Sequence, residues 1–300
     1  MLRTIILLLF TIIVVPIISF YYTEPLSDAQ IIILKNVALI ALGIALGCFL
    51  VSEIADNYSQ TDKMWSIAPI IYTWYITWSA DMDSRLVLMT ILVTLWGLRL
   101  TYNFNRRGGY SWKFWEGEED YRWAIVRKKP FLQSKWRWRL FNLFFIALYQ
   151  NTLILLFTLP ILAAYNGKPI SWMDYALAFL FLFFLIIETI ADQQQWNFQT
   201  RKHKLIKEKK ALKGDYLKGF LTSGLWAYAR HPNYFAEQAI WIVFYLFSVV
   251  ATGNWINWSI IGCLLLVLLF YNSSVFSEEI TATKYPDYKK YQARVGRFLL

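Results

Sequence analysis

The chain has 300 residues, of which 57% are hydrophobic and 19% aromatic, and its formal net charge is +10. A soluble domain of this length does not have such a composition, whereas an integral membrane protein does. The basic residues fall mainly in loops between apolar segments and lie in no recognised nucleic-acid-binding module, which excludes nucleic acid as a partner. The two cysteines, Cys48 and Cys263, lie in apolar runs without a Cys/His cluster, so we expect no metal site.

Apolar segments predict an all-α, polytopic integral membrane protein with about eight transmembrane helices. The segments are 4–22, 31–51, 64–80, 85–104, 140–162, 172–191, 239–251 and 255–271. Pro69 is expected to kink or interrupt the third segment.

Charge asymmetry predicts the orientation of these segments. If the loops 105–139 and 197–230 and both termini are cytoplasmic, only Lys35, Arg85 and Lys168 of the 30 basic residues remain on the other side. We therefore expect both termini to be cytoplasmic, in the bacterial inner membrane or the endoplasmic reticulum. We find no linker or repeat, so residues 1–300 are predicted to form a single membrane-embedded domain.

The stretch 225–238, L-W-A-Y-A-R-H-P-N-Y-F-A-E-Q, concentrates polar residues directly before an apolar segment. Pro232 suits the first position of a helix, whose unpaired N–H groups beside Arg230 would favour a phosphate or carboxylate. Asn233, Glu237 and Trp241 are four residues apart and are expected to share a face of this helix. The spacing is equally typical of an interfacial Arg/Tyr belt at the start of a helix.

Ionisable residues inside or at the ends of membrane spans are costly, which makes them candidates for function. All but one of them are expected near the cytoplasmic ends of the spans, which predicts one polar cavity open to the cytoplasm. These residues are Glu53, Arg99, Glu188, Asp192 and Glu237.

The sixth segment ends in the polar run A-D-Q-Q-Q-W-N-F-Q-T-R at 191–201. On a helix, Gln193, Asn197 and Arg201 share one face, and Asp192 shares another with Gln195. Amides in this number could bind a ribose, a nicotinamide or an adenine, or they could form only a polar cap at the end of the helix.

Two further segments also leave two interpretations open. The tyrosines at 285, 288 and 291 suit a tail that contacts phosphate or a base, and equally an amphipathic helix on the membrane surface. The run Arg106-Arg107-Gly108-Gly109 could hold a phosphate or could be the basic end of the fourth span.

Five short stretches of the sequence, called blocks below, together resemble the steroid 5-alpha-reductase-like family, and more closely its bacterial and lower-eukaryotic branch. The resemblance covers about residues 50–298, with 56–300 as the reductase-like region and 1–55 as N-terminal spans. The blocks are N-Y-S-Q-T-D-K-M-W-S-I-A-P at 57–69, W-G-L-R-L at 96–100, E-D-Y-R-W at 119–123, A-D-Q-Q-Q-W-N-F-Q at 191–199 and R-H-P-N-Y-F-x-E at 230–237.

This resemblance implies a helical membrane fold that holds NADPH from the cytoplasmic side. It also implies hydride transfer to the β-carbon of a carbon–carbon double bond conjugated to a carbonyl. Asn233 and Glu237 match the family's Asn-x-x-x-Glu cofactor contacts, the face at 192–201 matches the adenosine and ribose end, and Tyr285 to Lys290 matches its basic tail. The expected cofactor contacts are Arg99, Arg106, Arg122, Asp192, Gln193, Asn197, Arg201, Arg230, His231, Asn233, Tyr234, Glu237, Tyr285 and Lys290.

The chain departs from the family on the substrate side. Reductases that act on steroids have a Tyr three residues before the Arg that corresponds to Arg99, where this chain has Trp96. Their Gln-Glu pair on an early span corresponds here to Ser52-Glu53. We expect a reductase of a lipophilic steroid-like, enoyl or enone substrate, with Glu53 as the acid, kept neutral by burial, or Tyr58 or Tyr102 in its place.

Two other functions compete with the reductase. Membrane methyltransferases of the isoprenylcysteine and phospholipid types share the R-H-P-x-Y run, a downstream Glu and a Tyr-rich tail that hold S-adenosylmethionine; here that Glu would be Glu278 or Glu279. A non-catalytic lipid-binding relative is the third possibility, and Trp96 is its main support.

Overall fold

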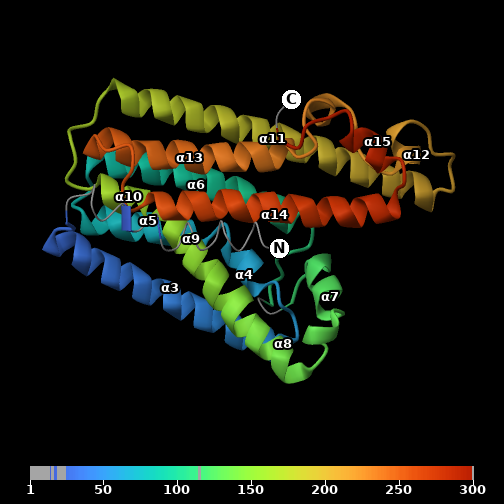
Figure 1. Ribbon diagram of the computed structural model, residues 1–300, viewed down its shortest axis with the longest axis horizontal. Helices are drawn as coiled ribbons and strands as arrows, with labels where there is room; N and C mark the ends of the chain where they lie inside the picture. Colours follow the sequence, from blue (N-terminus) through green and yellow to red (C-terminus); the bar gives the residue numbers. More distant parts are fainter. Residues whose placement is uncertain (1–13, 15–16, 19–24, 114–115, 299–300) are drawn as a thin grey trace. The chain divides into compact units, whose positions relative to one another are not determined.

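The computed structural model describes residues 14, 17–18, 25–113 and 116–298, and regular structure in this part of the chain is helical (Figure 1). The first predicted span, 4–22, lies almost wholly outside the described residues. The first half contains α3 (Asp28–Ala55), α4 (Gln60–Met64), α5 (Ala68–Ser79), α6 (Ser84–Asn105), α7 (Tyr121–Arg127), η2 (Pro130–Leu132), α8 (Lys135–Phe141), η3 (Asn142–Tyr149), α9 (Gln150–Thr158) and α10 (Pro160–Ala164). The second half contains α11 (Trp172–Lys207), α12 (Asp215–Lys218), η4 (Gly224–Ala227), α13 (Pro232–Thr252), α14 (Ile260–Lys284) and α15 (Tyr288–Gln292).

Six helical segments of the described chain are long and apolar enough to cross a membrane: α3, α6, the continuous run 135–164, α11, α13 and α14. This confirms the prediction of an all-α, polytopic membrane protein. Several spans are longer than predicted, because polar residues continue the helices beyond the apolar core. In particular, α11 continues to Lys207 and α14 to Lys284, where the sequence predicted ends at 191 and 271.

The third predicted span, 64–80, is not among these six segments. The chain there forms α4 and then α5, so the segment is interrupted next to Pro69 as expected, and Pro69 lies in the first turn of α5. Proline suits that position because its missing N–H would be unpaired there anyway. The 12 residues of α5 extend about 18 Å, which is shorter than a hydrocarbon core of about 30 Å.

The chain divides into two compact units, whose boundaries fall within α11, α13 and α14. In described residues, the N-terminal unit comprises 14, 17–18, 25–113, 116–178 and 244–264, and the C-terminal unit comprises 179–243 and 265–298. That the chain forms one domain stays a prediction.

Within the N-terminal unit, α3 packs against η3 and α9, and α5 packs against α6 (Figure 1). Ser27 and Gln30 form a capping box at the start of α3, in which each side chain bonds the other's backbone N–H. A buried ion pair fastens α6 to α11: Arg85 Nε and Nη2 donate to the two carboxylate oxygens of Asp174 at 2.6 and 2.9 Å. Arg85 also donates to the carbonyl of Lys168 at 2.5 Å, which fixes the loop between α10 and α11.

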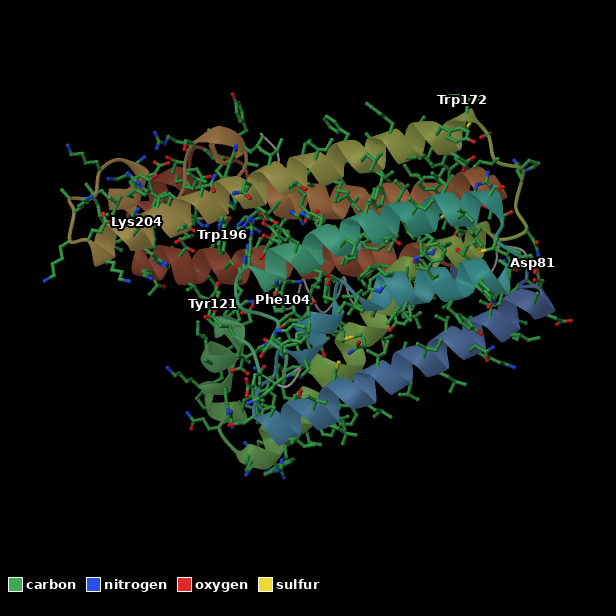
Figure 2. All side chains as sticks on the ribbon, turned by 180° about the vertical axis from the view of Figure 1, so that it is seen from behind. Asp81, Phe104, Tyr121, Trp172, Trp196 and Lys204 are labelled. Atoms are coloured by element: carbon green, nitrogen blue, oxygen red, sulfur yellow. The ribbon has the colours of Figure 1, made fainter. Side chains whose placement is uncertain are left out.

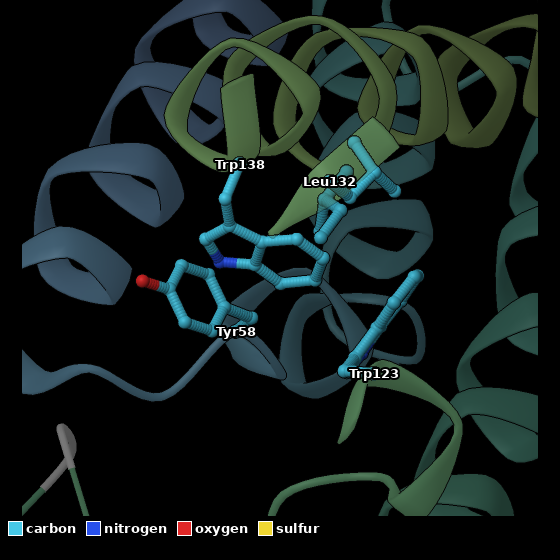
Figure 3. Packing of buried hydrophobic residues seen from close by; sticks show 5 residues of the cluster. Tyr58, Trp123, Leu132 and Trp138 are labelled. Atoms are coloured by element: carbon cyan, nitrogen blue, oxygen red, sulfur yellow. The ribbon is translucent and has the colours of Figure 1, made fainter. Parts of the chain in front are cut away.

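A second core of the N-terminal unit lies under α7 and α8, where Tyr58, Trp123, Leu132 and Trp138 pack together (Figure 3). The Tyr58 and Trp138 rings meet edge to face with centroids 5.0 Å apart, the arrangement that aromatic pairs favour. This core holds the loop 105–139 as structured helices, where the sequence showed only a long polar loop.

Candidate functional site

The predicted helix after Arg230 begins at Pro232, as expected. Arg230 is 9% exposed, and its Nε and Nη2 donate to the two carboxylate oxygens of Glu278 at 2.7 and 3.2 Å. His231 Nε2 lies 3.0 Å from the same carboxylate. The anion that Arg230 contacts is therefore a carboxylate of the chain itself, Glu278, one of the two anion types expected there.

The C-terminal segment closes around this carboxylate. Gln292 Nε2 and Arg297 Nη2 lie 2.9 and 3.4 Å from Glu278 Oε2. The backbone N–H groups of Arg230 and His231 donate to carbonyls of residues 296 and 297 at 2.9 and 3.0 Å. Among the sequence-based expectations, Glu278 had a role only in the methyltransferase alternative. A carboxylate inside an apolar helix was the signal for a buried partner.

Asn233 connects two of the blocks that carry the family resemblance, 191–199 and 230–237. Its Nδ2 donates to Asp192 Oδ1 at 3.0 Å, which connects the start of α13 to the polar end of the sixth predicted span. Nearby, Trp226 Nε1 donates to the carbonyl of Ala191 at 3.2 Å, and the Leu225 N–H donates to Gln194 Oε1 at 3.0 Å. The blocks 191–199 and 225–237 thus form one polar region within the C-terminal unit.

Two acceptor atoms in this region have no protein partner. Asn233 Oδ1 and Gln195 Oε1 are buried and accept no hydrogen bond within the described residues. A buried acceptor without a donor costs about 1–3 kcal/mol, so such atoms need an explanation. A ligand that brings N–H or O–H donors would satisfy them.

The predicted polar face of α13 is confirmed. Trp241 Nε1 donates to Glu237 Oε1 at 3.0 Å, one helical turn away, and Glu237 is 4% exposed. The indole therefore supplies one of the polar partners that a carboxylate in an apolar helix requires. Together with Glu188 and Asp192, each 5% exposed, Glu237 makes this region rich in buried carboxylates.

The other predicted face of α11 is exposed. Gln193 Nε2 donates to Asn197 Oδ1 at 2.7 Å, and Arg201 lies further along the helix, also exposed. The buried cation on this helix is Lys202, which donates to the carbonyl of Gly219 at 2.8 Å and to the Tyr285 hydroxyl at 2.9 Å. Sequence reasoning missed Lys202 because it is one of many cations between 199 and 224.

The predicted tail residues have different environments. Burial raises the pKa of Tyr285, but the hydrogen bond and charge of Lys202 and the charge of Lys284 outweigh it and lower the pKa overall. Lys290 is exposed and pairs with Asp287 at 2.8 Å. Tyr234 stacks on His231 with ring centroids 5.2 Å apart, which places it beside the Glu278 cluster.

The three residues predicted as proton donors all lie in the N-terminal unit. Glu53 accepts hydrogen bonds from Arg139 at 2.9 Å and from Asn142 at 2.8 Å. Tyr58 is a core residue that donates to Asp56 at 3.0 Å, and burial raises its pKa to about 12. Tyr102 on α6 is 66% exposed.

The predicted cations at 99, 106 and 122 also belong to this unit. Arg99 is half-buried on α6, and Arg106 follows the same helix and donates to Asn103 at 2.8 Å. Arg122 forms two hydrogen bonds with Asp120 at 2.9 and 2.8 Å. Burial raises the pKa of Asp120, but Arg122 outweighs it, so the pKa is lowered overall.

Two other blocks that carry the family resemblance, 57–69 and 119–123, are in contact within the N-terminal unit. The Tyr58 N–H donates to Glu119 at 2.7 Å, the Asp120 N–H donates to Ser59 Oγ at 2.9 Å, and Trp123 Nε1 donates to Asp62 at 3.0 Å. The blocks 57–69 and 119–123 are therefore partners in one loop–loop contact, which explains why both sequences carry many polar residues.

The six candidate spans and the buried polar clusters between them define a polytopic helical membrane protein. The chain belongs to the family described as "Protein of unknown function (DUF1295)", whose model matches residues 48–295. Uncharacterized protein C594.04c of Schizosaccharomyces pombe is 37% identical over 261 residues, which cover 83% of this chain and 74% of that protein. No solved structure matches the chain.

Proposed function

We propose that this protein is a membrane-bound reductase that uses NADPH to reduce a carbon–carbon double bond conjugated to a carbonyl in a lipophilic substrate. The observation that supports the proposal most is the Asp192–Asn233 hydrogen bond at 3.0 Å. It joins the two blocks that most resemble the steroid 5-alpha-reductase-like family, and both belong to that family's cofactor half.

The side chains of this region fit the donors of a nicotinamide dinucleotide. A carboxamide, ribose hydroxyls and an adenine amino group all carry N–H or O–H donors. The buried oxygens of Asn233 and Gln195, which accept no protein hydrogen bond, are suitable acceptors for them. The exposed Arg201 suits a 2′-phosphate, whereas Arg230 does not, because Glu278 already neutralises it.

The chemistry divides between the cofactor and the protein. When bound, NADPH would supply the hydride that reaches the β-carbon. The chain would orient that hydride donor through Asn233 and Glu237, exclude water with the surrounding apolar helices, and deliver a proton to the α-carbon. The products are then the saturated carbonyl compound and NADP⁺.

The experiment is a thermal-unfolding comparison of the detergent-purified protein with NADPH, NADH and S-adenosylhomocysteine. A ligand at about 100 times its Kd stabilises the native state by about 2.7 kcal/mol. We expect NADPH to raise the unfolding temperature of the wild type and of a Gln133→Ala control, whose amide lies in the N-terminal unit. Asn233→Ala and Gln195→Ala should reduce that shift. Stabilisation by none of the nucleotides would contradict the proposal.

A second candidate function is a methyltransferase that uses S-adenosylmethionine. It is supported by the cluster of Arg230, His231 and Glu278, because these are the residues through which the chain resembles membrane methyltransferases. Stabilisation by S-adenosylhomocysteine and not by NADPH would favour it. Binding of NADPH without its oxidation over a broad panel of lipid enones would favour the non-catalytic relative.

The proposal includes cytoplasmic termini, because the cofactor is cytoplasmic and the loops on that side carry most of the Lys and Arg residues. Single cysteines introduced at Lys207 and at Lys168 test this orientation. We expect a membrane-impermeant maleimide to label the Lys168 position in intact cells, and the Lys207 position only after permeabilisation. The reverse pattern would invert the topology.

A further inference from the structure

The segment 121–141, which contains α7, η2 and α8, has a distinctive charge pattern that the proposed chemistry does not use. It has no Asp or Glu, and its basic residues are Arg122, Arg127, Lys128, Lys129, Lys135, Arg137 and Arg139. Three of these arginines pair with acids elsewhere in the unit, at Asp120, Asp56 and Glu53. The segment therefore combines an anchored side with a side that carries further positive charge.

The helix that starts at Lys135 has two different faces. Trp138 and Asn142 are each 1% exposed and face the core of the unit. The outward side chains are Trp136, Leu140 and Phe144, which are 59%, 43% and 61% exposed. Because the run 135–164 is long and apolar enough to cross a membrane, this outward apolar face suits lipid. Trp136 then marks the level of the membrane interface, where tryptophan is enriched.

Three exposed cations lie close to Trp136 in the sequence. Lys128, Lys135 and Arg137 are exposed, and none of them takes part in a salt bridge among the described residues. The Arg137 guanidinium lies over the Phe131 and Trp136 rings, 5.2 and 5.6 Å from their centroids. Stacking of this kind holds the guanidinium beside the aromatic rings while its N–H donors stay available.

We propose that Lys128, Phe131, Lys135, Trp136 and Arg137 form a surface that binds the headgroups of anionic phospholipids. The two aromatic side chains enter the interfacial region, and the three cations contact lipid phosphates, with Arg137 able to form two parallel hydrogen bonds. Each cation at an anionic membrane surface contributes about a fivefold gain in affinity, so the three together contribute roughly 100-fold. This surface would hold the loop 105–139 against one leaflet.

The test uses the purified full-length protein in an uncharged detergent. It is titrated with phosphatidylglycerol and, separately, with phosphatidylcholine of the same acyl chains, and bound lipid is measured by native mass spectrometry. The wild type is expected to prefer phosphatidylglycerol, and added salt should weaken that preference. The triple variant Lys128→Gln, Lys135→Gln, Arg137→Gln should lose the preference by a factor on the order of 100. If the triple variant unfolds, each single substitution should still lower the preference about fivefold.

A matched control removes three charges elsewhere: Lys207→Gln, Lys209→Gln and Lys213→Gln. Figure 2 labels Trp172 and Lys204 near the two ends of α11. Its 36 residues extend about 54 Å, against a hydrocarbon core of about 30 Å. With Trp172 at one edge of the hydrocarbon, Lys207 would stand roughly 20 Å beyond the other edge, which exceeds the Debye length of about 8 Å.

The control variant should keep the lipid preference of the wild type. A charge-conserving variant, Lys128→Arg, Lys135→Arg, Arg137→Lys, should also retain most of it. A wild type that binds both lipids equally would overturn the proposal, and so would equal losses in the two neutralised variants, because net charge alone would then explain binding.

Discussion

Replacement of Glu278 by Ala is the sharpest test of how the C-terminal unit is held together. Glu278 is 3% exposed and contacts Arg230, His231, Gln292 and Arg297 at 2.7 to 3.4 Å. Its removal leaves the Arg230 charge buried without its carboxylate. Loss of one partner from a buried ion pair costs about 3–5 kcal/mol, so we expect a loss of that size in the free energy of unfolding.

The assay is chemical unfolding in detergent, with limited proteolysis of the C-terminal segment as a second measurement. Glu279→Ala is the matched control, since this neighbouring carboxylate is exposed and its loss should change stability by less than about 0.5 kcal/mol. Cleavage near residues 292–298 should increase in Glu278→Ala, because the Gln292 and Arg297 side chains lose a partner. Equal stability of the two variants would refute the assignment of Glu278 as the centre of the cluster.

A double-mutant cycle separates the ion pair from the other contacts of Arg230. The double variant Arg230→Met, Glu278→Leu should lose less stability than the sum of its single variants, because it leaves no isolated buried charge. Some loss should remain, since Arg230 also donates to the carbonyls of Gln292 and Val295 at 3.1 and 2.5 Å. Simple additivity would mean that the two charges do not interact.

Three further predictions concern other contacts. Arg85→Lys should cost several kcal/mol in unfolding free energy, because lysine cannot reproduce the two-pronged contact with a buried carboxylate; no change in the unfolding midpoint would contradict this. Gly219→Ala should destabilise more than Gly214→Ala: both have positive φ, but only at Gly219 would a Cβ meet the Tyr285 ring; equal midpoints would argue against the contact. Because the pKa of Tyr285 is lowered, its phenolate should form at a lower pH than an ordinary tyrosine's, and Lys202→Met should reduce that shift in the phenolate absorbance, since Lys202 is the largest cause that lowers the pKa; an unchanged titration would exclude the pairing.

Much of the candidate site follows from local spacing. The helix start at Pro232 and the shared face of Asn233, Glu237 and Trp241 depend on helical period and on the chemistry of proline. The cost of a carboxylate inside an apolar helix likewise does not depend on the fold, and Glu237 has a polar partner in Trp241 Nε1. The indole that donates to this carboxylate lies one helical turn away, which is the same four-residue spacing.

Other contacts could not be predicted, because they join residues that are distant in sequence. Nothing local indicates that Arg230 meets Glu278, which lies 48 positions along the chain, or that Lys202 alone among its neighbours is buried. The exact break in the segment 64–80 could not be predicted either: its composition suits a membrane, but the helix stops at Met64 and α5 has 12 residues. Hydropathy measures the solvent that a segment prefers, not the length over which it stays helical.

The sequence by itself therefore determined that this is a helical membrane protein with a polar, carboxylate-rich region at the ends of its spans, because membrane insertion and helical period act on adjacent residues. Only the tertiary structure decided which charges neutralise one another. Arg230 belongs to Glu278, Arg85 to Asp174 and Arg139 to Glu53. Pairing of this kind depends on distances across helices, and it separates the cations that hold the protein together from those left available for a ligand or a lipid.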